Sequence, residues 1–497
     1  MVSMSAFIKR YKAKNGATVI QVVYKHGRKV EKTVHIGTAH TEDDLELLIA
    51  LAHHTIQGEQ TAMDLFPEQD DAVGLAMQRS YPKLLWDVLA HVYDQLDFDS
   101  IGDGIFKQLV LARLIEPVSK LDTIRVLEEI GQEAPSNAEV HRTLRRTVVA
   151  DYRGKASKCC FEHAAPNSLT LLLYDVTTLY FEVQKEDDYR RPGMSKERRL
   201  EPQITVGLLV GRDGFPLEIK SFEGNRAEVK TIMEVLDAFK ARCGLDEVTV
   251  TADAAMLSSK NIQTLEDAGF HYIIGSRIAK TPYDIAEYVR KPGAELIDKQ
   301  VFDTTLTMNT GKNTARVTRR VIYQYRKDRA ALDLRNIDKL VAKAQKMVDG
   351  KTEFKRNRFL KTEGIVKTIN HELVEESRLK AGIKGYVTDL DVPAQEIIDA
   401  YHQLFQVERS FRMSKSDLKA RPIFHHKRDS IEAHLTVVFV ALAVARRIEY
   451  KTNMSIKRFI KTLKPIQTGV LLVNGKPRIV PPVLKVETKR LLSSLDR

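Results

Sequence analysis

The chain has 497 residues, 43% of them hydrophobic, which is enough for about three domains with cores of their own. Its formal net charge of +12 favours a polyanionic partner such as nucleic acid, although many soluble proteins without one are mildly basic. The three cysteines lack the spacing of a metal site or a disulfide framework. Lysines and arginines interrupt any N-terminal signal, and the longest apolar stretch, Leu435 to Ala445, is too short to span a bilayer. We therefore expect a cytoplasmic protein rather than a secreted or membrane protein.

Residues 6 to 37 alternate between apolar and polar side chains, as a β-meander does. Asn15-Gly16 is a hairpin-turn signal, and His26-Gly27 is a weaker one. The segment is also basic, through Lys9, Arg10, Lys12, Lys14, Lys25, Arg28 and Lys29. Two roles stay open for it: tracking DNA phosphates, or forming a small solvated sheet.

The pattern of residues 83 to 148 predicts short helices. One runs from Gly104 to Leu114 and stops before Pro117, and a second is capped by Ser119 and ends at Gly131. Residues 136 to 139 form a capping box that opens a third helix. This last helix is basic, through His141, Arg142, Arg145 and Arg146. The arrangement is typical of a helix-turn-helix-like DNA reader, but a plain helical bundle with a basic surface fits equally well.

From Ser168 onward the pattern changes to three strands, a helix, a strand, a helix and a strand, which is the order of an RNase H-like domain. The predicted strands are 169–183, 204–210, 215–222, 247–253 and 272–275, and the predicted helices are 226–243 and 258–268. Asp175 interrupts the apolar run of the first strand. Asp253 ends the fourth strand. Each aspartate alone has an ordinary explanation, as a turn or helix cap.

A helix begins near Pro393 and carries Tyr401, Glu408 and Lys415, each seven residues after the last. Two helical turns take about 7.2 residues, so the three side chains share one stripe on the edge of an apolar face. A carboxylate in that position is costly unless it is paired or binds a metal. The ordinary explanation is an ion pair with Arg412, four residues on.

This helix resembles the Y-R-E-K signature of insertion-sequence transposases with a DDE active site. Tyr401, Glu408 and Lys415 fall on the signature, whereas Leu404 stands where the family has arginine. Residues 416 to 425 also resemble the subgroup with long chains. The resemblance implies an α/β fold: an RNase H-like catalytic domain with a β-rich insertion, preceded by a small β-meander and a helical DNA-binding region. It also implies membership of the hairpin-forming cut-and-paste group.

The resemblance further implies that Asp175, Asp253 and Glu408 hold two Mg²⁺ or Mn²⁺ ions, because hard cations prefer oxygen ligands and two metals suit phosphoryl transfer. Lys415 would contact a DNA phosphate near the scissile bond, unless it is simply a solvated lysine. Tyr401 would either position a DNA end or pack in the core. On the helical region, Arg142, Arg145 and Arg146 would bind the DNA end. The partners would be double-stranded DNA, as terminal inverted repeats and target, and a second copy of the chain in a synaptic homodimer.

The expected domains are a basic β-meander (1–40), a helical DNA-end-binding region (41–165), a catalytic domain (166–280 and 391–450), a β-rich insertion (281–390) and a C-terminal helix and hairpin (451–497). The expected function is cleavage at transposon ends and strand transfer into target DNA by a bacterial, nucleoid-associated enzyme. Two alternatives stay open: a nuclease or resolvase on the same fold, and a DNA-binding descendant without catalysis.

Overall fold

The computed structural model describes residues 4–496 except 14–15, 28, 40, 60–74, 165–168, 170, 183–185, 194–200, 227–230, 245–247, 255–258, 277, 279–281, 310–315, 354, 364–365 and 474–475. The chain divides into two compact units. One comprises Met1–His91, Arg125–Ala134 and Lys457–Arg497, and the other comprises Val92–Ile124 and Pro135–Ile456. Each unit is described by itself.

The first unit begins with the predicted β-meander. Strands β1 (Met4–Lys12), β2 (Thr18–His26) and β3 (Lys29–Ala39) form an antiparallel sheet in that order. Helix α1 (Glu42–Glu59) packs against it, with Ala52 in contact with the side chains that β2 buries. One hairpin-turn residue, Asn15, lies outside the described residues, whereas Gly16 has the positive φ that such a turn requires.

A second small sheet in this unit joins segments far apart in the sequence. The predicted C-terminal hairpin is present as β15 (Thr468–Val473) and β16 (Lys476–Val480), although its turn residues, Asn474 and Gly475, lie outside the described part of the chain. Strand β4 (Leu75–Tyr81), which the sequence pattern did not indicate, pairs with the other edge of β15. The unit also contains α17 (Val486–Leu495).

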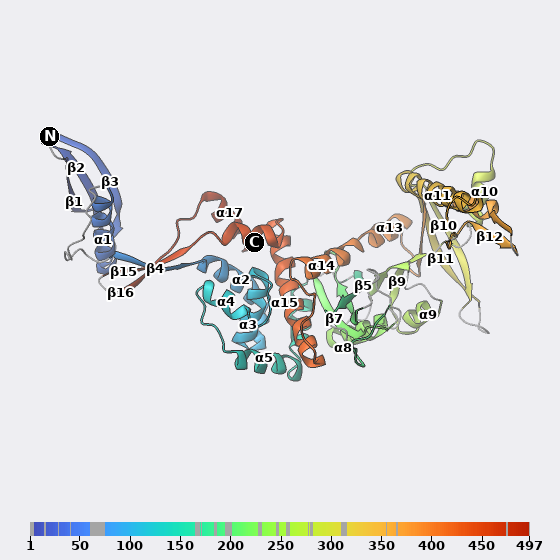
Figure 1. The fold of residues 1–497 in the computed structure, drawn as a ribbon, viewed down its shortest axis with the longest axis horizontal. Coiled ribbons are helices and arrows are strands. Elements are labelled where there is room, and N and C mark those ends of the chain that lie inside the picture. Colours follow the sequence, from blue (N-terminus) through green and yellow to red (C-terminus); the bar gives the residue numbers. More distant parts are fainter. Residues whose placement is uncertain are drawn as a thin grey trace. The chain divides into compact units, whose positions relative to one another are not determined.

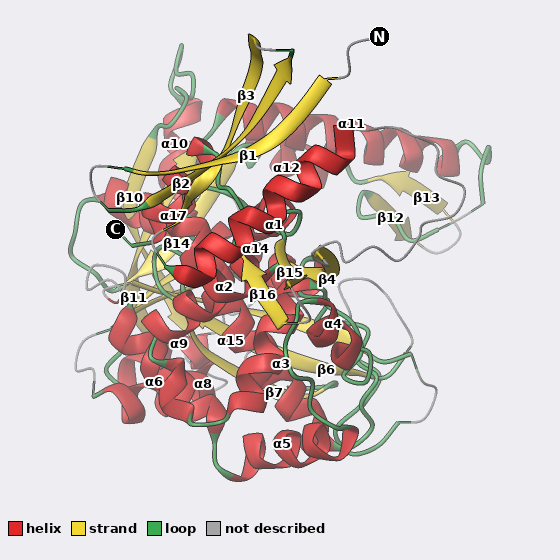
Figure 2. Cartoon of the chain, turned by 90° about the vertical axis from the view of Figure 1, so that its left-hand side faces the viewer, coloured by secondary structure: helices red, strands yellow, loops and turns green. Residues whose placement is uncertain are grey.

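The second unit is built on one eight-stranded sheet, ordered β10-β11-β14-β9-β8-β5-β6-β7 (Figures 1 and 2). Five of its strands match the predicted catalytic strands in order: β5 (Leu171–Tyr180), β6 (Gln203–Val210), β7 (Pro216–Glu223), β8 (Thr249–Ala252) and β9 (His271–Ser276). The first three form an antiparallel meander, while β8 runs parallel to both β5 and β9. This topology confirms the RNase H-like arrangement.

The centre of this sheet is buried on both faces. All eight residues of β6 are buried, so the strand does not alternate between buried and exposed side chains. Helix α8 (Thr231–Cys243) covers one face, where the Tyr174 hydroxyl lies 2.7 Å from Thr231 Oγ1. At position 207 only glycine fits, because a Cβ would lie 2.4 Å from the same hydroxyl.

The expected β-rich insertion is continuous with the catalytic sheet. Strands β10 (Val301–Asn309), β11 (Arg316–Tyr325) and β14 (Ile383–Thr388) extend the catalytic sheet, because β14 pairs with the edge of β9. An unpaired β9 would expose hydrogen-bonding groups along that edge. The insertion also contributes helices and a short hairpin: α10 (Tyr283–Arg290), α11 (Lys327–Val348), α12 (His371–Leu379), β12 (Leu360–Glu363) and β13 (Val366–Ile369).

Helix α15 (Arg428–Thr452) joins the helical region to the sheet. It is buried nearly all round, and it contacts α3 (Gly104–Ile115), α5 (Asn137–Val149) and α6 (Tyr152–His163) as well as β7 (Figure 1). The two predicted domains therefore share one core here, and the boundary at residue 165 stays a prediction. Within the described residues, neither α15 nor any other helix is long and apolar enough to cross a membrane.

The predicted capping box is present at the start of α5. Ser136 Oγ accepts a hydrogen bond from the Glu139 amide, and the Glu139 carboxylate accepts one from the Ser136 amide at 2.9 Å. The described residues contain seven further helices: α2 (Lys83–Gln95), the 3₁₀ helix η1 (Phe98–Ile101), α4 (Thr123–Glu129), α9 (Ser259–Asp267), α13 (Ala394–His402), α14 (Phe405–Ser416) and α16 (Ile456–Leu463). The cap predicted for α9, Ser258, lies outside the described residues.

Candidate active site

The signature segment is not one continuous helix, which corrects the prediction. Tyr401 lies on α13, whereas Glu408 and Lys415 lie on α14 (Phe405–Ser416). Where the two helices meet, three amides bond to carbonyls only three residues back: Gln403 to Ala400, Leu404 to Tyr401 and Gln406 to Gln403. These bonds tighten the backbone toward 3₁₀ geometry, so a seven-residue spacing no longer places Tyr401 on the stripe of the other two.

Asp175 and Asp253 are brought together by neighbouring parallel strands. The paired residues of β5 and β8, such as Leu173 and Thr251, differ by 78 in residue number, and the two aspartates do so as well. Asp253 directly follows β8. If the pairing of β5 with β8 is extended by two residues beyond Leu173 and Thr251, Asp253 falls opposite Asp175. Adjacent strands lie about 4.8 Å apart. Asp253 is exposed and Asp175 is partly buried, and the extended register predicts that the two carboxylates lie near each other.

Tyr401 links the signature segment to this pair. Its hydroxyl donates to Asp253 Oδ1 at 3.3 Å, and its ring packs 4.8 Å from that of Tyr386. Burial, followed by the negative charge of Asp253, raises the pKa of the phenol, so Tyr401 stays protonated as the donor. Position 275 of β9 must be glycine, because a Cβ would lie 2.5 Å from the Tyr401 hydroxyl. Tyr401 therefore packs in the core and also orients a candidate carboxylate.

Lys384 of β14 is a site residue that the sequence reasoning missed. Its Nζ lies 4.2 Å from the centroid of the Tyr401 ring. Burial, and then the charge of Arg329, lowers the pKa of Lys384, while the charges of Asp253 and Glu408 oppose that shift. Lys384 thus lies within electrostatic reach of both carboxylates. One feature of the sequence could have indicated Lys384: it is the only charged residue of the mostly buried strand β14. Asp175 is likewise the only charged residue of β5.

A cavity of about 600 Å³ adjoins this cluster. Asp253 and Tyr401 line it together with Lys384, and helix α11 of the insertion contributes Arg329. The insertion supplies four cations to the lining of this cavity, Arg329, Arg358, Lys380 and Lys384, and one carboxylate, Asp333. Positive charge in such a position suits a ligand that carries phosphates.

Glu408 is exposed on α14, which packs against β5 and β6. Lys415 lies partly buried in the last turn of the same helix. Leu404, which replaces the arginine of the signature, is buried. In the described portions of the chain, no three His, Cys, Asp or Glu side chains converge closely enough to hold one metal ion. The contacts that the structure shows at this place join Asp253, Tyr401 and Lys384.

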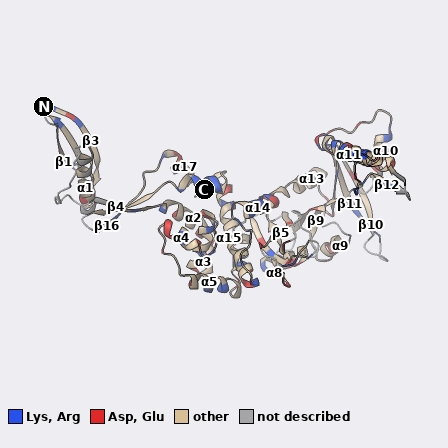
Figure 3. Ribbon diagram, viewed as in Figure 1, with Lys and Arg blue, Asp and Glu red and all other residues tan. Residues whose placement is uncertain are grey.

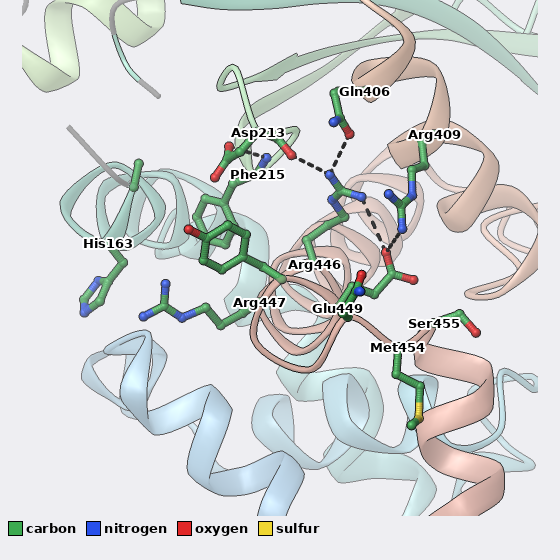
Figure 4. A pocket seen from close by; sticks show the side chains of 13 residues that line it. His163, Asp213, Phe215, Gln406, Arg409, Arg446, Arg447, Glu449, Met454 and Ser455 are labelled. Atoms are coloured by element: carbon green, nitrogen blue, oxygen red, sulfur yellow. Dashed lines mark hydrogen bonds and ion pairs between the residues drawn. The ribbon is translucent and has the colours of Figure 1, made fainter. Parts of the chain in front are cut away.

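A second cavity adjoins the same helix but contains none of the three predicted carboxylates. Figure 4 shows Gln406 and Arg409 of α14 with Arg446 and Glu449 of α15, joined by hydrogen bonds and ion pairs. The backbone carbonyl of Asp213 accepts from Arg446 at 2.6 Å, and its carboxylate accepts from the Phe215 amide at 3.0 Å. Asp213 therefore has the turn role that its sequence position suggests.

The predicted DNA-binding arginines of α5 differ in their surroundings. Lys and Arg residues occur along α5 and the strands of the N-terminal sheet, as the blue segments of the ribbon in Figure 3 indicate. Arg142 and Arg145 are exposed. Arg146 instead pairs with Asp103, the N-cap of α3, at 3.0 Å from Nε and 2.7 Å from Nη2. The structure thus gives Arg146 a role in holding α5 to α3, and its contact with DNA stays a prediction.

Replacing Arg146 with Ala is expected to lower the thermal stability of the protein at neutral pH. Burial alone would raise the pKa of Asp103, but hydrogen bonds from Arg146, Phe106 and Tyr152 hold it below its usual value. A lowered carboxyl pKa contributes stability above the unfolded-state pKa of about 3.9, and this contribution disappears as the pH falls through the folded-state value. The difference in melting temperature between wild type and Arg146→Ala should be largest above about pH 5 and should become smaller below about pH 4. Thermal melts of wild type, Arg146→Ala and the exposed control Arg145→Ala across that range would measure it; equal melting temperatures would contradict it.

Comparison with known proteins identifies the family of this chain. Residues 166–444, more than half of the chain, match the family described as the transposase DDE domain. No curated protein matches the sequence. Among solved structures, the chain is similar to a piggyBac transposase in a cryo-EM synaptic complex with hairpin DNA, at 9% identity and a TM-score of 0.38, over 77% of this chain and 69% of that chain. By the match over residues 166–444, this chain belongs to the family of transposases with a DDE domain.

Proposed function

We propose that this chain is the transposase of an insertion sequence, which cuts DNA at the ends of its element and joins those ends to target DNA. The observation that supports the proposal is the register of β5 and β8 in an RNase H-like sheet, because its continuation by two residues predicts that Asp175 lies near Asp253. Two carboxylates from neighbouring strands, next to a cationic cavity, suit phosphodiester chemistry better than either would alone.

The carboxylate pair fits divalent metal ions. Mg²⁺ is commonly bound through one or two carboxylates together with substrate phosphates, and Asp175 and Asp253 offer that number of hard oxygen ligands. Glu408, on the helix that packs against β5, would supply the third carboxylate. Two such ions, when bound, would activate the attacking oxygen and neutralise charge at phosphorus.

Other residues of the chain would position DNA at this pair. Tyr401 holds Asp253 by its hydrogen bond, which limits the rotamers of that carboxylate. Lys384 and Arg329 line the adjoining cavity and would attract phosphate oxygens, with Lys415 as a further contact. Arg142 and Arg145 on α5 and the lysines of β1 to β3 would bind the terminal repeats. Joining two ends requires two active sites, so we propose a homodimer in the synaptic complex.

The experiment that tests this function separates joining from cutting. Purified protein, a labelled duplex carrying one end of the element and a supercoiled target plasmid would be incubated with Mg²⁺. We expect the labelled strand to become covalently attached to the plasmid, because a transposase uses the released 3′ hydroxyl as the attacking group. Cleaved end DNA with no plasmid-linked label would support the nuclease alternative, and binding without cleavage would support a non-catalytic descendant. A random duplex of equal length is the control.

A further inference from the structure

A second cationic pocket lies apart from the carboxylate pair, and neither the mechanism nor the comparisons assign it a role. It measures about 670 Å³ and is lined by the segment after α3, by residues 419 to 425 after α14, and by His434 of α15. Arg113 and Lys120 line it although they are only 6% and 8% exposed. Lys419 and Arg421 add two more cations to the lining, against one carboxylate, Asp122.

The two buried cations have no carboxylate partner among the residues that the structure describes. Neither Arg113 nor Lys120 takes part in an ion pair or a side-chain hydrogen bond there, whereas comparably buried Arg319 is paired with Glu266. Burial lowers the pKa of Arg113 to about 10, and burial together with Arg113 lowers that of Lys120. A buried charge without a partner is destabilising, and buried charges in proteins are normally paired. The pocket therefore lacks the anion that would offset these charges.

The two histidines of the pocket are neutral and do not supply that anion. The His434 Nε2 lies 3.1 Å from the Ala420 carbonyl, an arrangement that fits a neutral ring donating to that oxygen. Burial, followed by the charges of Lys120 and Arg113, lowers the pKa of His425 to about 4. The centroid of the His425 ring lies 5.7 Å from that of His434. His425 is therefore a neutral polar group in the lining of the pocket.

We propose that this pocket binds a backbone phosphate of DNA, held by Arg113 and Lys120. Arginine and lysine are the usual phosphate ligands in DNA-binding proteins. Two neighbouring features favour a nucleic-acid phosphate over a free one. Phe424, 64% exposed, lines the pocket, where it can contact a sugar or base. His141 of α5, the helix that also carries the exposed Arg142 and Arg145, lies within electrostatic reach of His425.

The inference rests on the proposed function only in taking DNA as the ligand; it does not need the carboxylates to be catalytic. Lys120→Met removes the charge and keeps the length of the side chain. In full-length protein without added anion, the variant should melt at the same temperature as wild type or higher, because an unpaired buried charge is removed. Inorganic phosphate should raise the melting temperature of wild type more than that of the variant.

DNA binding provides the second measurement. In Ca²⁺, Lys120→Met should bind a labelled duplex about tenfold more weakly, which corresponds to about 1.4 kcal/mol, and its slope of log affinity against log salt should be smaller by about one. Arg113→Met should behave in the same way, and the exposed Lys158→Met should match wild type. The same loss is expected in an Asp253→Asn background, so the result does not depend on cleavage.

Three outcomes would overturn the inference. If both Met variants melt well below wild type or fail to fold, the two cations are structural. If the phosphate response disappears but DNA affinity and salt slope stay at wild-type values, the pocket takes a free anion instead. If neither phosphate nor DNA distinguishes the variants from wild type, the pocket binds no phosphate.

Discussion

Replacing Asp253 with Asn is expected to reduce cleavage of element-end DNA by several orders of magnitude while leaving DNA binding intact. The substitution keeps the shape of the side chain but removes the charge that a divalent metal needs. Metal ions contribute several kcal/mol to the stabilisation of the transition state, and about 1.4 kcal/mol corresponds to a factor of ten in rate. Asp175→Asn and Glu408→Gln should give losses of the same order.

Binding should persist in these variants because phosphate contacts come mainly from lysine and arginine. Removing a negative charge beside the cavity that Lys384 lines should even tighten binding slightly, because repulsion of phosphate falls. The measurement is end cleavage in Mg²⁺, with affinity measured in Ca²⁺. Asp213→Asn is the matched control, since its carboxylate lies in a hairpin turn and bonds to the Phe215 amide. Wild-type cleavage by Glu408→Gln would remove Glu408 from the site, and wild-type cleavage by either aspartate variant would falsify the carboxylate pair.

The affinity for DNA is expected to fall by about 10³ to 10⁵ between 50 and 200 mM salt, as for proteins with about six to ten phosphate contacts. The reason is that each lysine or arginine that neutralises a phosphate releases a condensed counterion. The net charge of +12 and the basic residues of β1 to β3 and of α5 motivate this expectation.

Fluorescence anisotropy with an end-containing duplex, at several salt concentrations in Ca²⁺, would measure the slope. A random duplex of equal length serves as the control and should show a similar slope at lower affinity, because the electrostatic contribution does not depend on sequence. An affinity that stays constant over this range would show that hydrogen bonds to bases, rather than phosphate contacts, dominate binding.

Local patterns in the sequence determined most of the secondary structure. Strands β5 to β9 were predicted in the right order because they are runs of apolar residues bounded by turn signals, and the Ser136 cap of α5 depends on residues three apart. The same patterns singled out Asp175 and Asp253, since a charged residue in or directly after an apolar strand requires an explanation. The strand order then implied the RNase H-like sheet, which the structure confirms.

Only the tertiary structure decided which side chains meet. The break between α13 and α14, the pairing of β14 with β9, and the approach of Lys384 to Asp253 and Glu408 all depend on contacts between residues far apart in the chain. Arg113 and Lys120 could not be recognised as a buried cationic pair, because burial at those positions comes from packing against α15 and the segment after α14. Periodicity reports which residues tend to be buried, whereas the packing of distant segments determines their neighbours and therefore their chemistry.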